Sequence, residues 1–253
     1  MSDRPMHTVP GLYQKLEQIY AEGERLINEG QLQAAVEKFS EGLALDDHFR
    51  QRYVTMYAQR GFAHQRLGNV TEAVEDYSRA IEMEPPINQA QYHFHRGMCF
   101  GKMEGMEERA VEDYTRSIEL YPDHPGPYHL RGKLLVDVFE RYKDAIGDFD
   151  RLAELAPHPE GYQLRGFSKY MLKDYDGAAE DLAKSSELRP DPYNDYLAAC
   201  VFAAAEDVPA LVAAMQRTLA ADKTYLDAFG QDDEFAAYQE HPEFVEVLLS
   251  HAR

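Results

Sequence analysis

The sequence contains no tryptophan, only two cysteines and no long hydrophobic run. Two cysteines cannot build a disulfide scaffold, and Cys99 and Cys200 are expected to pack inside helices as small hydrophobes. The longest apolar run, from Leu197 to Ala205, is far too short to span a bilayer. The N-terminal stretch also lacks an apolar segment of signal-peptide length, since it reads MSDRPMHTVP. These absences favour a cytoplasmic protein in a reducing compartment.

Positive charge is scarce as well. The 253 residues include 26 Lys and Arg against 45 Asp and Glu, which gives a formal net charge of −19. This balance argues against nucleic acid as a partner, because phosphate binding requires clusters of Lys and Arg, and against an anionic membrane surface. The acidic residues are spread along the chain, so we interpret them as a solubilising surface; a site for a basic partner is the alternative.

A repeated pattern dominates what the sequence does contain. A glycine is followed 12 or 13 residues later by an alanine, four residues further by a large apolar residue, and in most copies by a closing proline. The copies are Gly23-Ala35-Phe39, Gly61-Ala73-Tyr77, Gly97-Ala110-Tyr114, Gly132-Ala145-Phe149 and Gly166-Ala178-Leu182, with a weaker sixth at Ala199-Leu211-Met215. Successive glycines are 38, 36, 35 and 34 residues apart. A period of this length predicts an array of helical repeats, in which each unit contacts mainly its neighbours.

The pattern resembles the tetratricopeptide repeat (TPR), a helix–turn–helix unit with small residues where its helices cross. The resemblance implies an all-α, TPR-type α-solenoid, a right-handed superhelix of about six helix-turn-helix repeats with a C-terminal helical cap. Within an array over residues 11–222, repeats are expected at approximately 16–49, 54–87, 90–124, 125–158, 159–191 and 192–222. Residues 1–10 are interpreted as a flexible N-terminal tail, and residues 223–253 as the segment that caps the last helix pair. Repeats three and four carry an extra residue, so irregular turns are expected there.

Charges at matching positions indicate contacts between the two helices of a repeat. An arginine precedes the glycine, and an aspartate follows the alanine by three residues, in four repeats: Arg60 and Asp76, Arg96 and Asp113, Arg131 and Asp148, Arg165 and Asp181. In the first repeat the signs are exchanged, with Glu22 opposite Lys38. We therefore predict a row of structural ion pairs; an arginine ladder that grips an anionic ligand is the alternative.

The resemblance also implies a concave groove lined by the first helix of each repeat. Its expected partner-binding residues follow a helical stripe and are Tyr20, Phe62, Arg66, Phe94, Met98, Lys102, His129, Lys133, Phe167, Tyr170, Met171 and Tyr196. Aromatic residues and methionine are typical of interface cores, so we interpret the stripe as a binding surface for a protein or peptide of apolar or aromatic character, with or without basic flanks. The alternative is that neighbouring helices or the C-terminal segment cover it.

TPR domains that bind the acidic tails of heat-shock chaperones carry Lys, Asn and Arg at set groove positions. Here the first-repeat positions hold Tyr20 and Glu24, and the third-repeat positions hold Gln91 and His95. The resemblance therefore argues against a chaperone C-terminal tail as the partner.

No catalytic or metal-binding motif is present. The sequence lacks HExxH, Cys-x-x-Cys, a P-loop and G-x-S-x-G, and the spacing of its ten histidines brings no three ligands together. His124, His129 and His158 lie near repeat boundaries without forming a recognisable set. We therefore expect no enzyme, no metal and no cofactor. The leading hypothesis is a non-catalytic protein–protein interaction scaffold or adaptor that binds a partner segment in its groove, and the alternative is a self-assembling structural TPR protein that forms a homo-oligomeric scaffold.

Overall fold

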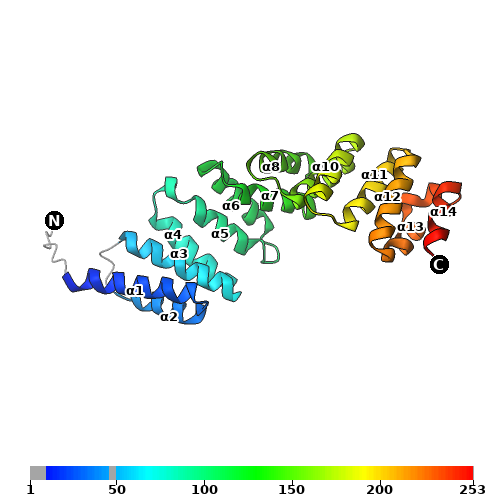
Figure 1. The fold of residues 1–253 in the computed structure, drawn as a ribbon. Helices are drawn as coiled ribbons and strands as arrows, with labels where there is room; N and C mark the ends of the chain where they lie inside the picture. The colour runs from blue at the N-terminus through cyan, green and yellow to red at the C-terminus, as the bar shows by residue number, and fades with distance from the viewer. Residues whose placement is uncertain (1–9, 46–49, 253) are drawn as a thin grey trace. The chain divides into compact units, whose positions relative to one another are not determined.

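The structure, a computed structural model, describes residues 10–45 and 50–252. Over these residues it is all-helical, and successive helices pack in pairs (Figure 1). The pairs are α1 (Pro10–Asn28) with α2 (Leu32–Leu43), α3 (Arg50–Leu67) with α4 (Val70–Met83), α5 (Ala90–Phe100) with α6 (Glu107–Leu120), α7 (Pro125–Asp137) with α8 (Tyr142–Leu155), α9 (Pro159–Met171) with α10 (Tyr175–Leu188), and α11 (Pro192–Ala204) with α12 (Val208–Ala221). We number these pairs as repeats one to six. Residues 1–9 of the expected N-terminal tail lie outside the described residues.

Two units can be distinguished, Met1–Pro127 and Tyr128–Arg253. The N-terminal unit holds repeats one to three, together with the short 3-10 helix η1 (Pro86–Asn88) between α4 and α5. The C-terminal unit holds most of repeat four, repeats five and six, and the final segment of the chain. Each unit is described by itself below.

Small residues allow the two helices of each repeat to approach closely. The five alanines of the repeated pattern, Ala35, Ala73, Ala110, Ala145 and Ala178, are fully buried. The glycines face the buried residue four positions after the alanine: a Cβ placed on Gly132 would lie 2.9 Å from Cε1 of Phe149. Such a separation is shorter than real Cβ contacts allow, so in repeats one, three and four the contact between glycine and aromatic ring sets the distance between the helices.

Each of the six turns inside the repeats contains one residue with positive φ. The first three turns use Gly30, Gly68 and Gly105, and the last three use Glu140, Lys173 and Glu206. A non-glycine residue with positive φ is uncommon, because its side chain crowds the backbone. We infer that the packing of the two helices on either side holds these turns in that conformation. Among these turns inside the repeats, the longest are residues 101–106 in repeat three and residues 138–141 in repeat four.

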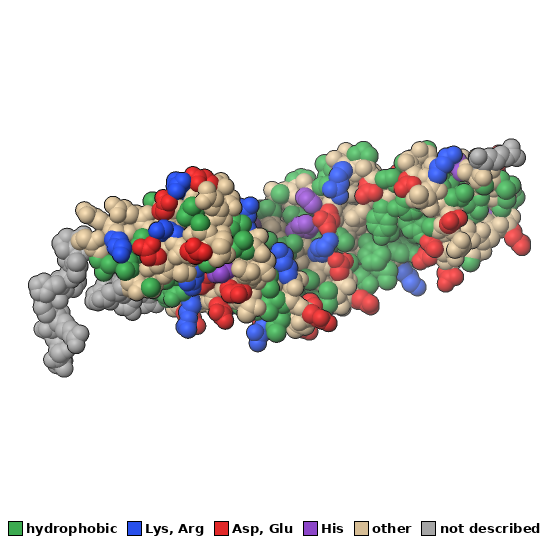
Figure 2. Space-filling model, turned by 90° about the horizontal axis from the view of Figure 1, so that it is seen from below, with side chains coloured by type: hydrophobic (Ala, Val, Ile, Leu, Met, Phe, Trp, Pro, Cys, Tyr) green, Lys and Arg blue, Asp and Glu red, His purple; other side chains and the backbone are tan. Residues whose placement is uncertain are grey.

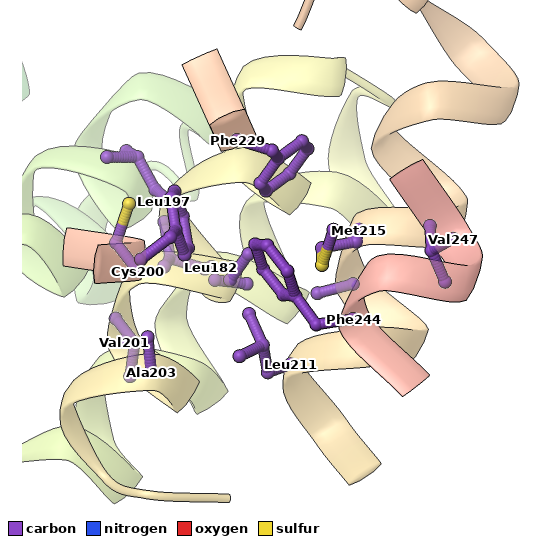
Figure 3. Close-up of a cluster of buried hydrophobic side chains, with 14 of the residues drawn as sticks. Leu182, Leu197, Cys200, Val201, Ala203, Leu211, Met215, Phe229, Phe244 and Val247 are labelled. Atoms are coloured by element: carbon purple, nitrogen blue, oxygen red, sulfur yellow. The ribbon is translucent and has the colours of Figure 1, made fainter. Parts of the chain in front are cut away.

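The final segment covers the end of the last repeat. It consists of η2 (Lys223–Tyr225), α13 (Leu226–Gln231), η3 (Asp233–Tyr238) and α14 (Pro242–His251). Phe229, Phe235 and Phe244 are fully buried in one cluster with Leu211 and Met215 of α12. Phe229, Phe244, Leu211 and Met215 are labelled in Figure 3. An array leaves one apolar face of its last helix pair without a following repeat, and these phenylalanines occupy that face.

The state of the two cysteines and the composition of the helices complete the description of the fold. Cys99 and Cys200 are both buried as free thiols, and burial raises the pKa of Cys99 to about 11 and that of Cys200 to about 12. Neither thiol is therefore a reactive thiolate at neutral pH. Among the described helices, none combines the length and the apolar composition needed to cross a membrane.

Candidate partner-binding site

A pocket of about 500 Å³ opens in the N-terminal unit where α5 begins. Its lining comes from three places: η1, the first two turns of α5, and the end of α6 with the connection that follows. The lining residues are Ile87, Asn88, Ala90, Gln91, Phe94, His95, Ser117, Leu120, Tyr121 and His124. We call this the repeat-three pocket. Its volume suits one large side chain of a ligand together with adjacent backbone.

Phe94 lies among the aromatic rings of this pocket. Its ring centroid is 4.9 Å from that of His124, 5.5 Å from that of His95 and 6.2 Å from that of Tyr114. The contact with His124 depends on Gly126, because a Cβ there would lie 2.8 Å from Cζ of Phe94 and from Cε1 of His124. The backbone N–H of Gly126 also donates to Nδ1 of His124 at 3.1 Å, which holds the imidazole in place.

His95 lies next to Phe94 in the lining of the pocket and contacts further aromatic rings. Its ring stacks on Tyr77 at 5.6 Å with an interplanar angle of 14° and meets the ring of Phe62 at 6.2 Å. Its Nδ1 is buried and has no hydrogen-bond partner among the described residues. Burial lowers the pKa of His95, and the neighbouring His124 lowers it further, so the ring is neutral at neutral pH. A neutral imidazole has one nitrogen that accepts a hydrogen bond and one that donates.

Two apolar side chains of this pocket reach solvent. Ile87 is 78% exposed and Tyr121 is 53% exposed. Exposed apolar residues beside a concave pocket are a common feature of interaction sites, since a bound partner removes both from water.

Of the twelve residues expected to line a groove, only Phe94 lines this pocket. Arg66, Lys102 and Met171 are exposed, and the other nine are half-buried. In the N-terminal unit, Tyr20 donates its hydroxyl to Glu24 at 2.7 Å, and the guanidinium of Arg66 lies 5.9 Å from the ring centre of Phe62. Met98 is half-buried on α5. These side chains contact their own repeats as well as solvent.

In the C-terminal unit, the expected groove residues also find partners within the fold. The ring of Phe167 meets Tyr142 edge-on at 6.1 Å, and Tyr170 lies 6.2 Å from Tyr175. His129 and Lys133 both approach Glu160. The broadest gathering of hydrophobic side chains on the face shown in Figure 2 also lies in this unit.

Tyr196 is half-buried and contacts the C-terminal segment. Its ring lies 5.2 Å from Tyr225 and 5.5 Å from Phe229, and its hydroxyl donates to a carboxylate oxygen of Asp232. The segment after residue 222 does not follow the repeat pattern, so the sequence could not indicate which groove position it would occupy.

Arginine and aspartate meet in four repeats through two parallel hydrogen bonds each. The Nε and Nη2 distances to the carboxylate oxygens are 2.8 and 2.7 Å for Arg60–Asp76, 2.8 and 2.8 Å for Arg96–Asp113, 2.9 and 2.6 Å for Arg131–Asp148, and 2.8 and 2.5 Å for Arg165–Asp181. All four aspartates are buried. This bidentate geometry is the strongest form of the contact, and it occupies the arginine edge that an anionic ligand would need.

The arginines also join neighbouring repeats, which the sequence pattern did not indicate. Nη1 of Arg60 donates to Oγ of Ser40 on α2, and Nη1 of Arg96 donates to Oγ of Ser78 on α4, both at 2.9 Å. Ser40 and Ser78 each follow the aromatic residue of the preceding repeat by one position. That recurrence is the signal by which the contact could have been found.

Glu22 and Lys38 act on each other through their charges, but their direct hydrogen bonds go to other residues. Glu22 accepts from Arg25 at 2.7 Å, and Lys38 donates to Glu41 at 2.8 Å. Both partners lie one helical turn away on the same helix, and each of the four side chains is about one-third exposed or more. Local pairs between neighbours at i and i+3 need less ordering of long side chains than a pair across the two helices.

Three potential metal ligands converge in the C-terminal unit, contrary to the expectation from histidine spacing. His129 of α7, His158 at the N-cap of α9 and Glu160 in the first turn of α9 place one donor atom each within 4.8 Å of one another. The rings of His129 and His158 have centroids 4.8 Å apart. The convergence depends on how repeats four and five stack, which residue spacing alone does not reveal.

The comparisons with known proteins agree with the repeat geometry. A tetratricopeptide repeat model matches residues 54–86, and a second model of the same repeat matches residues 91–124. These ranges contain α3 with α4 and α5 with α6. The chain contains tetratricopeptide repeats in these two segments. The predicted all-α, TPR-type solenoid is confirmed.

One curated relative is similar to part of this TPR chain. Human tetratricopeptide repeat protein 13 is 31% identical over 126 residues, which is 48% of the TPR chain and 14% of that relative. The TPR chain therefore spans about a seventh of the length of the relative it matches.

Several solved structures share the fold. The C-terminal part of a TPR protein from Cytophaga hutchinsonii superposes with a TM-score of 0.72 at 15% identity, covering 92% of the TPR chain and 93% of that structure. MamA from Desulfovibrio magneticus has a TM-score of 0.59 at 21% identity, covering 69% and 94%. YrrB, described as a TPR protein with an unusual peptide-binding site, has a TM-score of 0.58 at 19% identity, covering 68% and 85%. At these identities the similarity shows the fold alone.

Proposed function

We propose that this TPR chain is a non-catalytic protein-interaction scaffold that binds a segment of a partner protein. The repeat-three pocket would receive an apolar or aromatic side chain of that segment. The observation that carries the proposal is the combination of a pocket of about 500 Å³, an aromatic wall around Phe94 and the exposed apolar residues Ile87 and Tyr121. A partner that covers an apolar cavity and the exposed apolar surface beside it removes both from water, which favours binding.

Polar recognition in this site would come from His95. Its buried Nδ1 has no partner among the described residues, so a hydrogen-bonding group of the ligand, such as a backbone amide or a hydroxyl, would satisfy it. The net charge of −19 would attract a segment with basic flanks from a distance, whatever fills the pocket itself. The resemblance to YrrB supports the same class of function, since that protein is described as having a peptide-binding site. The low cysteine content fits a reducing compartment such as the cytoplasm.

The test uses matched pairs of exposed apolar residues. A pocket variant carries Ile87→Glu and Tyr121→Glu, and a control variant carries Val138→Glu and Leu249→Glu. Val138 and Leu249 are 48% and 62% exposed and lie outside the pocket, so both variants add the same charge at comparable exposure. Circular dichroism melts would establish that both variants are folded.

The wild type and both variants, each with all 253 residues, are then used as bait in lysate of the source cells, and bound proteins are quantified by mass spectrometry. We expect at least one partner that wild type and control retain and that the pocket variant loses. Titration of that purified partner should show a loss of about tenfold or more in affinity, because a charge would be buried in an apolar contact. Equal recovery of every partner by both variants would rule out the repeat-three pocket as the binding site.

Self-assembly is the second candidate, and exposed apolar residues of the C-terminal unit favour it. Met171, Leu172 and Tyr193 are each at least 44% exposed. Sedimentation velocity over a range of protein concentrations separates the two functions. A mass that rises with concentration and returns to that of a monomer in Met171→Glu/Tyr193→Glu would support self-assembly, and a constant monomer mass would exclude it.

A further inference from the structure

A cluster of ligand-type side chains lies where repeat four meets repeat five, within the C-terminal unit and apart from the repeat-three pocket. His129 projects from α7, whereas His158 and Glu160 lie on either side of Pro159 at the start of α9. One donor atom of each side chain falls within 4.8 Å of the other two. The three residues therefore form one cluster although they come from two repeats.

Within the described part of the chain, one imidazole nitrogen of each histidine in this cluster lacks a hydrogen bond that would satisfy it. Nε2 of His129 and Nδ1 of His158 are both buried, and neither has a hydrogen-bond partner among the described residues. Nε2 of His129 lies 3.4 Å from Oε2 of Glu160. Two donor atoms bound to one tetrahedral Zn²⁺ at bond lengths of 2.0–2.2 Å stand about 3.3–3.5 Å apart. The separation of these two atoms thus already matches the edge of such a site.

Lys133 holds the carboxylate in this orientation. Its Nζ donates to Oε1 of Glu160 at 2.5 Å, which leaves Oε2 directed towards His129. A carboxylate that binds a metal through one oxygen is commonly hydrogen-bonded through the other by a neighbouring residue. The charge of Lys133 opposes a cation nearby, and Asp137, 4.0 Å from its Nζ, offsets part of that charge.

We propose that His129, His158 and Glu160 bind a divalent transition-metal ion of the Zn²⁺ type. Two imidazoles and one carboxylate favour such an ion over Mg²⁺ or Ca²⁺, which prefer sets made of oxygen atoms. Three protein ligands leave a fourth position for water or for a group from a partner. The ion would join α7 to α9 and so strengthen the interface between two neighbouring repeats, on which the stability of a repeat array depends.

The test uses the full chain without a polyhistidine tag, stripped of metal with a chelator. Zn²⁺ is titrated by calorimetry. In a separate experiment Co²⁺ is added, because its visible absorption is strong when it is bound in a tetrahedral site. The ligand variants are His129→Gln, His158→Gln and Glu160→Gln, each close in size to the original residue. The control is His64→Gln, which removes a half-buried histidine of the N-terminal unit.

We expect wild type and His64→Gln to bind one equivalent of Zn²⁺, to develop the Co²⁺ absorption and to melt at higher temperature as Zn²⁺ is added. Mg²⁺ at the same concentration should leave the melting temperature unchanged. Changes in residues that only orient a ligand weaken metal binding about 10–100-fold, so each ligand variant should lose about tenfold or more in Zn²⁺ affinity. If one ligand variant does not fold, the other two decide the result. Absence of stoichiometric Zn²⁺ binding by the wild type, or equal affinities in His158→Gln and His64→Gln, would overturn the proposal.

Discussion

Arg131 on α7 and Asp148 on α8 are joined by two parallel hydrogen bonds, Nε to Oδ2 at 2.9 Å and Nη2 to Oδ1 at 2.6 Å. The side chain of Arg131 is 19% exposed, whereas that of Asp148 is 5% exposed. The same contact recurs in repeats two, three and five. Because the contact joins the first and second helix at the same position of four repeats, we infer that its role is to hold the two helices of each repeat together.

Removal of Arg131 should therefore destabilise the fold. Arg131→Ala leaves the buried carboxylate of Asp148 without its cation, and we expect a loss of about 2–4 kcal/mol in the free energy of unfolding, somewhat below the range for fully buried pairs because the arginine is partly exposed. Arg141→Ala is the control, since Arg141 and Asp144 pair at 2.7 Å with both side chains more than half exposed. That change should cost less than about 1 kcal/mol. Urea denaturation of both variants checks the difference, and equal losses would contradict a structural role for the buried pair.

Two glycines of repeat four should respond in opposite directions to the same substitution. Gly132→Ala places a Cβ 2.9 Å from two ring atoms of Phe149, and such overpacking costs about 1–3 kcal/mol. Gly147 lies inside α8, and a Cβ placed there would have no neighbouring atom within 4 Å, so Gly147→Ala should gain about 1 kcal/mol from helix propensity. Thermal melts of the two variants measure both effects. If Gly132→Ala were instead more stable than wild type, the two helices would not pack as closely at Gly132 as the structure indicates.

His93 should tune the acidity of Asp113. Burial by itself raises the pKa of Asp113, but hydrogen bonds from Arg96 and from His93, the latter at 2.7 Å, outweigh it and lower the pKa below the ordinary value. A carboxylate with a lowered folded-state pKa stabilises the fold above its unfolded pKa of about 3.9, and this contribution disappears as the pH falls through the folded-state value. His93→Phe removes one hydrogen bond, so the pKa should rise and the stabilisation should be lost at a higher pH.

Carbon-detected NMR of the Asp113 carboxyl measures this pKa directly in wild type and in His93→Phe. His64→Phe, which changes a histidine of repeat two, is the control and should leave the titration of Asp113 unaltered. Superimposable titration curves for Asp113 in wild type and His93→Phe would mean that Arg96 alone sets its acidity.

The sequence was most informative at positions where the same residue type recurs from one repeat to the next. The positions of Arg131 and Asp148 relative to the glycine and alanine recur in four repeats, so a contact between two helices could be inferred from comparison within one chain. The same reasoning did not predict the direct hydrogen bonds of Glu22 and Lys38, because exposed side chains with local partners are not constrained by the helix crossing.

The candidate sites depend on residues outside the repeat pattern. Ile87 and Tyr121 lie before α5 and after α6, in connections whose conformation no periodicity specifies. His129 and Glu160 meet only because α7 lies beside the start of α9. Periodicity predicts which residues face the neighbouring helix, whereas a site built from two connections, or from two repeats, also requires their distances.

The C-terminal segment should be necessary for the stability of the last repeat. Phe244 of α14 is fully buried against a cluster that includes Leu211 and Met215 of α12. Phe244→Ala would leave a cavity beside α12, and removal of a buried phenylalanine side chain costs about 3–5 kcal/mol. Leu249→Ala, on the same helix at a position that is 62% exposed, should change the free energy of unfolding by less than about 0.5 kcal/mol.

Hydrogen exchange would show where the effect of Phe244→Ala is felt. Because each repeat contacts mainly its neighbours, amides of α11 and α12 should lose protection first, while those of α1 to α4 should keep theirs. Tyr196 should become accessible in the same variant, since Phe229 and Tyr225 of the displaced segment cover its ring. Protection that falls equally along the chain would show instead that the array unfolds as one cooperative unit, and the final segment would then stabilise every repeat.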